Sequence, residues 1–146
     1  LDPAPAPAGG LGQEVLSAID ILTPNEGEAG SLLGWQPRSP AEGLEAARQL
    51  RARGAAAAVV KLGAKGLAYA AADGEGTLPA FPVTAIDTVA AGDTFNGGLA
   101  NALERGLGFA EALRFASACG ALSTTRKGAS AAAPSLAEVA AFMASA

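Results

Sequence analysis

The sequence predicts an α/β fold in which helices flank a mostly parallel sheet. Short apolar runs that suit buried strands alternate with segments of helical periodicity, which is the pattern of strands joined by crossover helices. The composition agrees, because half of the 146 residues are hydrophobic and only 16% are charged, so a packed core can form. We expect ligands at the carboxyl ends of the strands, where sheets of this class bind them.

The first third of the chain shows a strand and two capped helices. Residues 11–18 have a short helical pattern, and the apolar residues 19–22 suit a buried strand. Thr23-Pro24-Asn25-Glu26 follows, which we interpret as an N-cap, a proline at the first helical position and a capping-box glutamate. Ser39-Pro40-Ala41-Glu42 repeats this arrangement and predicts the start of the next helix.

Two further strands and a hairpin are expected in the middle of the chain. Residues 57–62 predict a second buried strand, and a glycine-containing turn leads into a third strand over 67–72. Asp73-Gly74 is a hairpin turn signal, and we expect a short fourth strand over 77–83.

The remainder of the chain is predicted to be helical. One helix starts at Gly92 and runs towards Gly106, and another covers residues 109–125. Ser135 with Glu138 three positions later predicts the capping box of a last helix.

Composition and charge exclude several functions. The net charge is −4 and the ten basic residues are scattered, so the sequence shows no footprint for nucleic acid or for an anionic membrane surface. The longest apolar runs are too short to span a membrane. The single Cys119 excludes an intramolecular disulfide, and the absence of histidine excludes a Cys/His metal set.

The strongest chemical feature is the segment 87–98. The small residues Ala90, Ala91 and Gly92 allow a ligand to approach the backbone, and the helix that follows directs its unpaired N–H groups and the positive end of its dipole at that spot. Such an arrangement binds anions, and a phosphoryl group in transfer carries spread negative charge. Neither a P-loop nor a Gly-x-Gly-x-x-Gly pattern occurs.

Asp93 stands in the first turn of that helix. It is positioned to accept a proton from an attacking hydroxyl group, a general-base role typically worth a factor of about 10²–10⁴ in rate. The alternative is an ordinary N-cap, which is the commonest role of aspartate at a helix start. Gly97 and Gly98, inside the same helix, indicate close helix packing and no particular chemistry.

Two other loops hold candidate ligand-binding residues. Asn25 and Glu28 follow the first strand, where a carboxylate can hold Mg²⁺ through water; the alternative is helix capping. The turn after the second strand could lie against a base or a phosphate, or be a tight β-turn alone. Its residues are Lys61, Leu62, Gly63, Ala64, Lys65 and Gly66.

Together and in this order, these segments resemble the ribokinase-like carbohydrate kinases, the PfkB family, and within it the ribokinases. The segment from Asp87 to Gly97 resembles the C-terminal signature of that family and is highly specific. Four supporting segments match family patterns at residues 2–6, 23–28, 62–66 and 125–129, so the resemblance covers essentially the whole chain.

The resemblance implies a ribokinase-like fold and ATP-dependent phosphorylation of a sugar hydroxyl, at O5 of D-ribose for a ribokinase. Asp93 would be the base, and the amides of Ala90, Ala91, Gly92 and Asp93 would form the anion hole. Asn25 and Glu28 would lie near the phosphates and Mg²⁺. The other ATP contacts would be Lys61, Leu62, Gly63, Ala64, Lys65, Gly66, Gly92 and Ser117.

The family is also activated by a monovalent cation such as K⁺. The resemblance implies that its ligands, several of them backbone carbonyls, are Asp87, Val89, Ser123, Arg126 and Gly128. Three positions depart from the family pattern: Asp2 replaces an asparagine, Ser117 replaces a histidine or asparagine near adenine, and Ala132 replaces a serine that often helps the cation site.

The resemblance further implies that residues 1–146 are the C-terminal, ATP-binding and catalytic part of a ribokinase-like domain, without the sugar-binding half and its lid. The full-length protein would be a cytoplasmic homodimer, and this part alone would be inactive. The alternatives are a kinase of the same family for another sugar or a nucleoside, and a non-catalytic nucleotide-binding fragment. The proline-rich start, Leu1 to Pro7, is compatible with a flexible tail and with a chain that begins inside a larger protein.

Overall fold

A computed structural model describes residues 1–145 of the chain. The chain forms two compact units, Leu1–Pro79 (unit 1) and Ala80–Ala146 (unit 2). Unit 1 contains all the strands found in residues 1–145, and the described part of unit 2 is helices and loops.

The sheet of unit 1 has four strands in the order β1-β2-β3-β4. Only β1 and β2 pair in parallel, whereas β2–β3 and β3–β4 are antiparallel, so the sheet is mixed and the expectation of a mostly parallel sheet is wrong. The cause is the length of the connections, because a parallel crossover needs a dozen or more residues and the last two connections are short turns. The strands are β1 (Ile21–Leu22), β2 (Ala57–Lys61), β3 (Leu67–Ala71) and β4 (Gly74–Leu78).

The fourth strand begins earlier than the sequence indicated. It starts at Gly74, the second residue of the predicted turn, and Gly74 has a φ of +154°, which suits glycine. Thr77 pairs with Ala68 and Leu78 with Leu67, while residues 79–83 lie outside the strand. The turn sets the register of a hairpin, so the chain pairs at once instead of after a loop.

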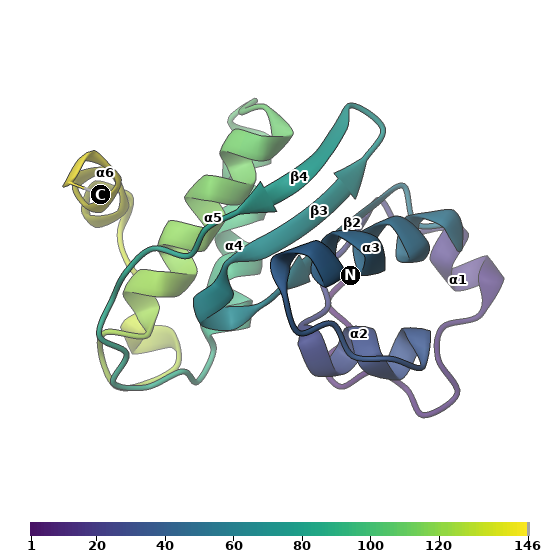
Figure 1. The fold of residues 1–146 in the computed structure, drawn as a ribbon. Helices are drawn as coiled ribbons and strands as arrows, with labels where there is room; N and C mark the ends of the chain where they lie inside the picture. Colours follow the sequence, from purple (N-terminus) through teal and green to yellow (C-terminus); the bar gives the residue numbers. More distant parts are fainter. Residues whose placement is uncertain (146) are drawn as a thin grey trace. The chain divides into compact units, whose positions relative to one another are not determined.

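Helix α3 covers part of the sheet in unit 1. Figure 1 shows α3 (Pro40–Ala52) running along the strands, and it packs against β2 and β3. Its predicted cap is confirmed, because the Ser39 hydroxyl oxygen accepts the N–H of Glu42 over 3.2 Å. A Cβ atom at Gly43 would lie 2.8 Å from Cδ1 of Leu62, so glycine allows this close approach. Buried residues of this core include Leu22, Ala46, Leu50, Val60 and Leu62.

Thr23 was predicted to cap helix α2 (Glu26–Leu33), but the residue at the cap position is Asn25. Thr23 is almost fully buried, and both its N–H and its hydroxyl donate to the carbonyl oxygen of Leu1, over 2.9 and 3.3 Å. The amino group of Leu1 donates in turn to Ile21 O over 2.6 Å, so the backbone of Leu1 pairs along β1. The short helix α1 (Gln13–Ser17) completes unit 1, together with the 3₁₀ turn η1 (Gly63–Lys65).

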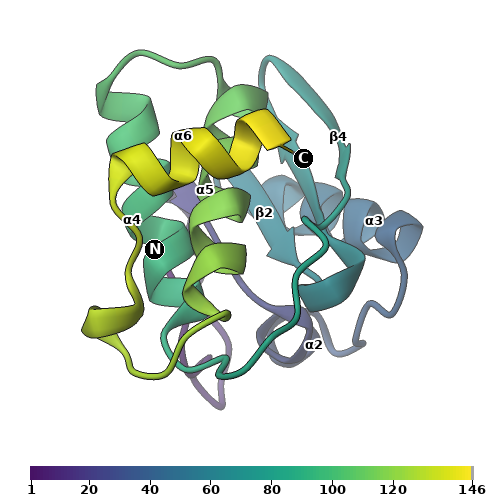
Figure 2. The same ribbon diagram turned by 90° about the vertical axis from the view of Figure 1, so that its left-hand side faces the viewer.

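Unit 2 is built on a helix pair. Helices α4 (Ala91–Glu104) and α5 (Phe109–Ser123) are joined by four residues and pack closely against each other, as Figure 2 shows. A short 3₁₀ turn η2 (Ser130–Ala132) precedes helix α6 (Leu136–Ser145), which packs against α5. These bounds lie within two residues of those predicted.

The close contact between α4 and α5 depends on glycine. A Cβ atom at Gly98 would lie 2.8 Å from Sγ of Cys119 and 3.2 Å from Cα of Ala116, which are impossible or very tight contacts. By contrast, a Cβ at Gly97 would meet no atom within 4 Å. The close packing that the two glycines predicted is therefore confirmed for Gly98. In residues 1–145, no helix combines the length and apolar character needed to cross a membrane.

Candidate active site

The turn before α4 is strained. Its N-cap residue Ala90 has φ 59° and ψ 14°, the left-handed conformation, and makes no side-chain cap. This conformation costs about 1–2 kcal/mol for a residue with a Cβ. The Ala90 carbonyl oxygen accepts both the N–H and the hydroxyl of Thr94, each over 2.9 Å, and these bonds hold the turn. A strained turn that is held in this way is a feature often found at functional sites.

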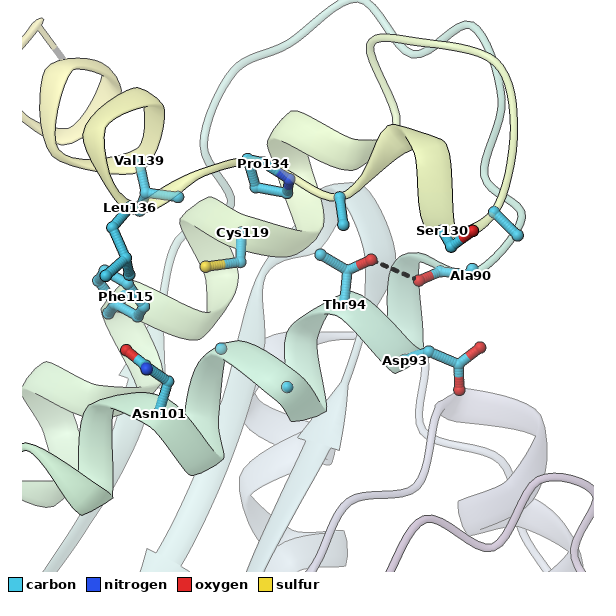
Figure 3. A pocket seen from close by; sticks show the side chains of 14 residues that line it. Ala90, Asp93, Thr94, Asn101, Phe115, Cys119, Ser130, Pro134, Leu136 and Val139 are labelled. Carbon is cyan, nitrogen blue, oxygen red and sulfur yellow. Dashed lines mark hydrogen bonds between the residues drawn. The ribbon is translucent and has the colours of Figure 1, made fainter.

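Asp93 is not the N-cap. It is the third residue of α4, its side chain is exposed, and within residues 1–145 its carboxylate has no hydrogen-bond or ion-pair partner. In Figure 3 the carboxylate points away from the apolar side chains of Cys119 and Phe115. The capping alternative is therefore wrong, and the carboxylate is free to act on a ligand.

Two backbone donors lie beside this carboxylate. The N–H groups of Gly92 and Asp93 meet no acceptor in the described part of the chain. The N–H of Ala91, which we expected in the anion hole, already donates to Thr88 O over 3.3 Å. Free N–H groups at the positive end of a 14-residue helix attract an anion, so the first turn of α4 presents an anion-binding group and a carboxylate together.

The Asp87 carboxylate ties two loops of unit 2 together. Its Oδ1 accepts the N–H of Val89 over 3.0 Å, and its Oδ2 accepts the N–H of Gly128 over 3.2 Å. These two hydrogen bonds, that from Val89 first, lower the pKa of Asp87 below its ordinary value. The structure therefore brings together three of the five residues expected at the cation site.

The other two residues expected there have different partners. The Ser123 side chain is buried, and its hydroxyl donates to Gly120 O over 2.8 Å. The Arg126 guanidinium pairs with Glu138 over 2.8 Å. Their side chains are thus engaged in the fold, which leaves their backbone carbonyls as the candidate ligands.

A pocket of about 530 Å³ lies within unit 2 (Figure 3). Asp93 and Thr94 belong to its lining, and its remaining wall is mainly apolar. Asn101 contributes a buried Oδ1 atom without a hydrogen-bond partner among residues 1–145. Other lining residues are Gly97, Gly98, Phe115, Cys119, Pro134, Leu136 and Val139.

In unit 1, Asn25 and Glu28 form a reciprocal capping box. The Asn25 Oδ1 accepts the N–H of Glu28 over 2.9 Å, and Glu28 Oε2 accepts the N–H of Asn25 over 2.7 Å. The capping alternative is therefore confirmed for this pair. The capping box uses only Oε2 of Glu28, so Oε1 remains available to a ligand.

The turn after β2 is tight, as its alternative interpretation predicted. Gly66 N–H donates to Gly63 O over 3.0 Å, and both glycines have positive φ angles of 92° and 57°. Lys61 pairs with Asp2 over 3.0 Å in a partly buried contact, and Lys65 pairs with Glu26 over 2.6 Å. Leu62 is buried and Ala64 is exposed. Both lysine ammonium groups thus have carboxylate partners.

Two contacts of the site were not predicted. The Thr124 carbonyl oxygen accepts the N–H groups of Ile86 and Asp87, over 2.7 and 3.1 Å, and braces the loop that carries Asp87. Glu138 was predicted only as a capping residue, although it also holds Arg126. Nothing in the local sequence indicates the contact of Thr124 with residues 86 and 87. The ion pair of Arg126 with Glu138 could have been predicted from their opposite charges, twelve residues apart.

Ser117, which was expected to contact ATP, lies half-buried on α5.

No group of three or more His, Cys, Asp or Glu side chains in residues 1–145 could enclose a metal ion. Mg²⁺ keeps several of its waters in proteins and is usually bound through one or two carboxylates. Glu28 offers one carboxylate oxygen, Oε1, whereas both oxygens of Asp87 already accept backbone N–H groups.

Comparisons with known proteins identify similar chains. The pattern of the pfkB family of carbohydrate kinases matches residues 1–136. A ribokinase of Haemophilus influenzae is 42% identical over 139 residues, which cover 95% of this chain and 45% of that protein. A ribokinase of Schizosaccharomyces pombe is 44% identical over 140 residues, covering 92% of this chain and 44% of the relative.

Solved structures show the same likeness. The ribokinase of Thermotoga maritima superposes with a TM-score of 0.83 and 38% identity, over 98% of this chain and 48% of that one. The Arabidopsis thaliana ribokinase complexed with ribose and ATP superposes with a TM-score of 0.82 and 33% identity, over 92% and 45%. The ribokinase-like α/β fold is therefore confirmed, and the chain spans less than half the length of these relatives.

Proposed function

Because the chain belongs to the pfkB family of carbohydrate kinases, we propose that the protein transfers the γ-phosphoryl group of ATP to a sugar hydroxyl, with D-ribose as the substrate and ribose 5-phosphate as the product. The similarity to several ribokinases supports ribose over other sugars. Residues 1–146 would be the C-terminal, ATP-binding and catalytic part of that enzyme. The relatives are more than twice as long, in agreement with this proposal.

The observation that carries the proposal is the free Asp93 carboxylate beside the free N–H groups of Gly92 and Asp93. In the proposed reaction Asp93 accepts the proton of the sugar hydroxyl. The hydroxyl oxygen forms a bond to the γ-phosphorus as the bond to the β,γ-bridging oxygen breaks, and ADP leaves. The two N–H groups and the helix dipole stabilise the charge on the transferring phosphoryl group.

The other predicted residues receive supporting roles. Asn25, Glu28, the turn from Lys61 to Gly66, and Ser117 are proposed as contacts to ATP, with Oε1 of Glu28 holding a water molecule of Mg²⁺. The oxygen atoms at Asp87, Val89, Ser123, Arg126 and Gly128 are proposed to hold K⁺. When bound, these cations neutralise phosphate charge and order the loops. Ala132 is buried and offers no side-chain oxygen to such a site.

A substitution of the base tests this proposal. In the full-length protein that contains this chain, Asp93→Asn should lower kcat for ribose phosphorylation by a factor of about 10²–10⁴, while Mg-ATP still binds. Coupled detection of ADP gives kcat, and calorimetry gives nucleotide binding. A variant that keeps most of its turnover would show that Asp93 is not the base. Glu104→Gln, an exposed substitution at the far end of α4, is the matched control.

A related kinase is the second candidate. Aminoimidazole riboside kinase of Salmonella enterica superposes with a TM-score of 0.77 and 32% identity. A 1-phosphofructokinase of Haloferax volcanii is 36% identical over 108 residues. A panel of ribose, fructose, fructose 1-phosphate and ribonucleosides separates these possibilities, because the preferred substrate is the one with the highest kcat/KM.

A non-catalytic role is the remaining alternative for this chain alone. We propose that residues 1–146 bind Mg-ATP weakly and turn over no sugar, because less than half of a relative's length is present. Calorimetry of this chain with Mg-ATP tests the binding.

For the full-length protein we propose a homodimer located in the cytoplasm. Light scattering of the purified protein tests the oligomeric state, and fractionation of cells tests the location.

A further inference from the structure

The carboxylate of Glu138 makes two connections at once. Its Oε2 accepts the N–H of Ser135 over 2.7 Å and the Ser135 hydroxyl over 2.9 Å, which closes the capping box of α6. Its Oε1 accepts an N–H of the Arg126 guanidinium over 2.8 Å. Helix α6 is therefore fastened at its first turn to the loop that follows α5.

That loop is also the one that receives Asp87. Thr124 accepts two N–H groups from residues 86 and 87, and Gly128 donates to Asp87 Oδ2 over 3.2 Å. Arg126 lies between these two anchor points in the sequence. Gly128 has a φ of +107°, a conformation that glycine adopts without strain, and the conformational freedom of glycine gives the loop little order of its own. The pair of Arg126 with Glu138 is a side-chain contact that can hold it.

We propose that Glu138 is a positioning residue of the candidate active site: through Arg126 it holds residues 124–128 in the conformation that receives Asp87, and so it orders the turn that leads into α4. The catalytic consequence rests on the function proposed above, whereas the chain of contacts does not. Glu138 itself touches none of the reacting groups.

The size of the effect follows from exposure. The Arg126 and Glu138 side chains are 37% and 46% exposed, and water weakens ion pairs of this kind. Loss of the pair should therefore raise the open fraction of the loop by only about threefold. The ion pair therefore stabilises the loop only slightly and is not needed for folding, so variants of Arg126 or Glu138 should fold.

Hydrogen exchange of backbone amides, followed by NMR on the 146-residue chain, tests the contact. Arg126→Met and Glu138→Gln should each speed the exchange of the Gly128 and Val89 amides about threefold, and the double variant should add nothing to either. The matched control is Glu75→Gln, which breaks the similarly exposed pair of Glu75 with Arg48 in unit 1 and should leave both amides unchanged.

Three results would overturn the inference. The first is that Arg126→Met and Glu138→Gln speed the exchange of the Gly128 amide no more than Glu75→Gln does. The second is that the effects of the two substitutions add fully in the double variant, and the third is that Ser135→Ala speeds the exchange equally. Ser135→Ala removes the hydroxyl of the cap but leaves the Arg126 pair in place. An equal effect there would assign the ordering to the cap alone.

Kinetics of the full-length protein test the positioning role. Arg126→Met should lower kcat several-fold with the KM for ribose unchanged, and Arg126→Lys, which keeps the charge, should recover part of the loss. Faster amide exchange without any fall in kcat would overturn the role in catalysis. If the wild-type protein phosphorylates no sugar, the proposed function fails, while the exchange experiment still decides the contact.

Discussion

The Oδ2 atom of Asp87 accepts a hydrogen bond from the N–H of Gly128, 41 residues further along the chain, over 3.2 Å. Its other oxygen accepts the N–H of Val89, so one carboxylate joins the turn before α4 to the loop after α5. The Asp87 side chain therefore helps to hold the conformation of both loops, with or without a bound ligand.

Asp87→Asn should loosen both loops. An asparagine offers only one acceptor oxygen, and its NH₂ group would face one of the two N–H donors. We expect faster hydrogen exchange at the amides of Val89 and Gly128, measured by NMR, with the amides inside α5 unchanged. Asp73→Asn, in an exposed turn of unit 1, is the control. Equal exchange in Asp87→Asn and the wild type would contradict the bridging role.

The contact between Gly98 and Cys119 predicts a coupled pair of substitutions. Gly98→Ala places a methyl group 2.8 Å from Sγ of Cys119 and should destabilise the protein by about 1–3 kcal/mol. Adding Cys119→Ala removes the sulfur and should recover part of this loss, although the Cβ contact at 3.0 Å remains. Urea unfolding of the two single variants and the double variant measures the coupling.

Gly97→Ala serves as the reference for that cycle. Its methyl group would meet no atom within 4 Å, so only helix propensity acts, and stability should be unchanged or rise by up to about 1 kcal/mol. Strictly additive effects of Gly98→Ala and Cys119→Ala would mean that α4 and α5 are not in contact at these residues.

The left-handed conformation of Ala90 predicts a stabilising glycine. Ala90→Gly removes the Cβ clash, worth about 1–2 kcal/mol, at an entropic cost of about 0.5–1 kcal/mol. The free energy of unfolding should therefore rise by about 0.5–1 kcal/mol. Ala100→Gly, an exposed position inside α4, should instead lower it by about 1 kcal/mol. A loss of stability in both variants would rule out strain at Ala90.

Helix capping at α6 predicts a dependence of stability on acid. Hydrogen bonds from the Ser135 backbone and hydroxyl, and then from Arg126, lower the pKa of Glu138 from 4.5 to about 2. Because the folded pKa is lowered, this contribution is complete above about pH 4.5 and disappears as the pH falls towards 2.

Urea unfolding between pH 6 and pH 2.5 measures this dependence. The difference in free energy of unfolding between the wild type and Glu138→Gln should be largest at pH 6 and shrink steadily below pH 4.5. The comparison with the variant removes the acid sensitivity of the other carboxylates. A difference that stays constant over this range would show that Glu138 is not held in the capping box.

Elements with short-range determinants could be predicted from the sequence. Ser39 and Ser135 were correctly identified as caps, because a capping residue and its partner lie within four positions. Residues 23–28 fit two overlapping patterns, a cap at Thr23 and capping by Asn25 with Glu28, and the structure shows the second. The Thr23 hydroxyl bonds instead to Leu1, 22 residues away, and that contact is invisible in a local pattern.

Strand direction and site geometry depend on longer-range contacts. An apolar run predicts a buried strand but not the direction of its neighbour, so the antiparallel pairing of β2 with β3 was missed. At the candidate site, the sequence predicted a helix start with Asp93 in its first turn, and the structure shows this turn. The tie between Asp87 and Gly128, and the engagement of the Ala91 N–H by Thr88, emerge only from the folded backbone.

The packing of α4 on α5 also has a practical use. Cys119 is the single thiol of the chain, it is only 6% exposed, and burial raises its pKa to about 11. At neutral pH the thiol is therefore protonated and almost fully covered, so a thiol-reactive dye should label it slowly in the folded protein. A rise in the labelling rate of the unmodified protein would report loosening of the packing around Cys119, and it requires no engineered probe.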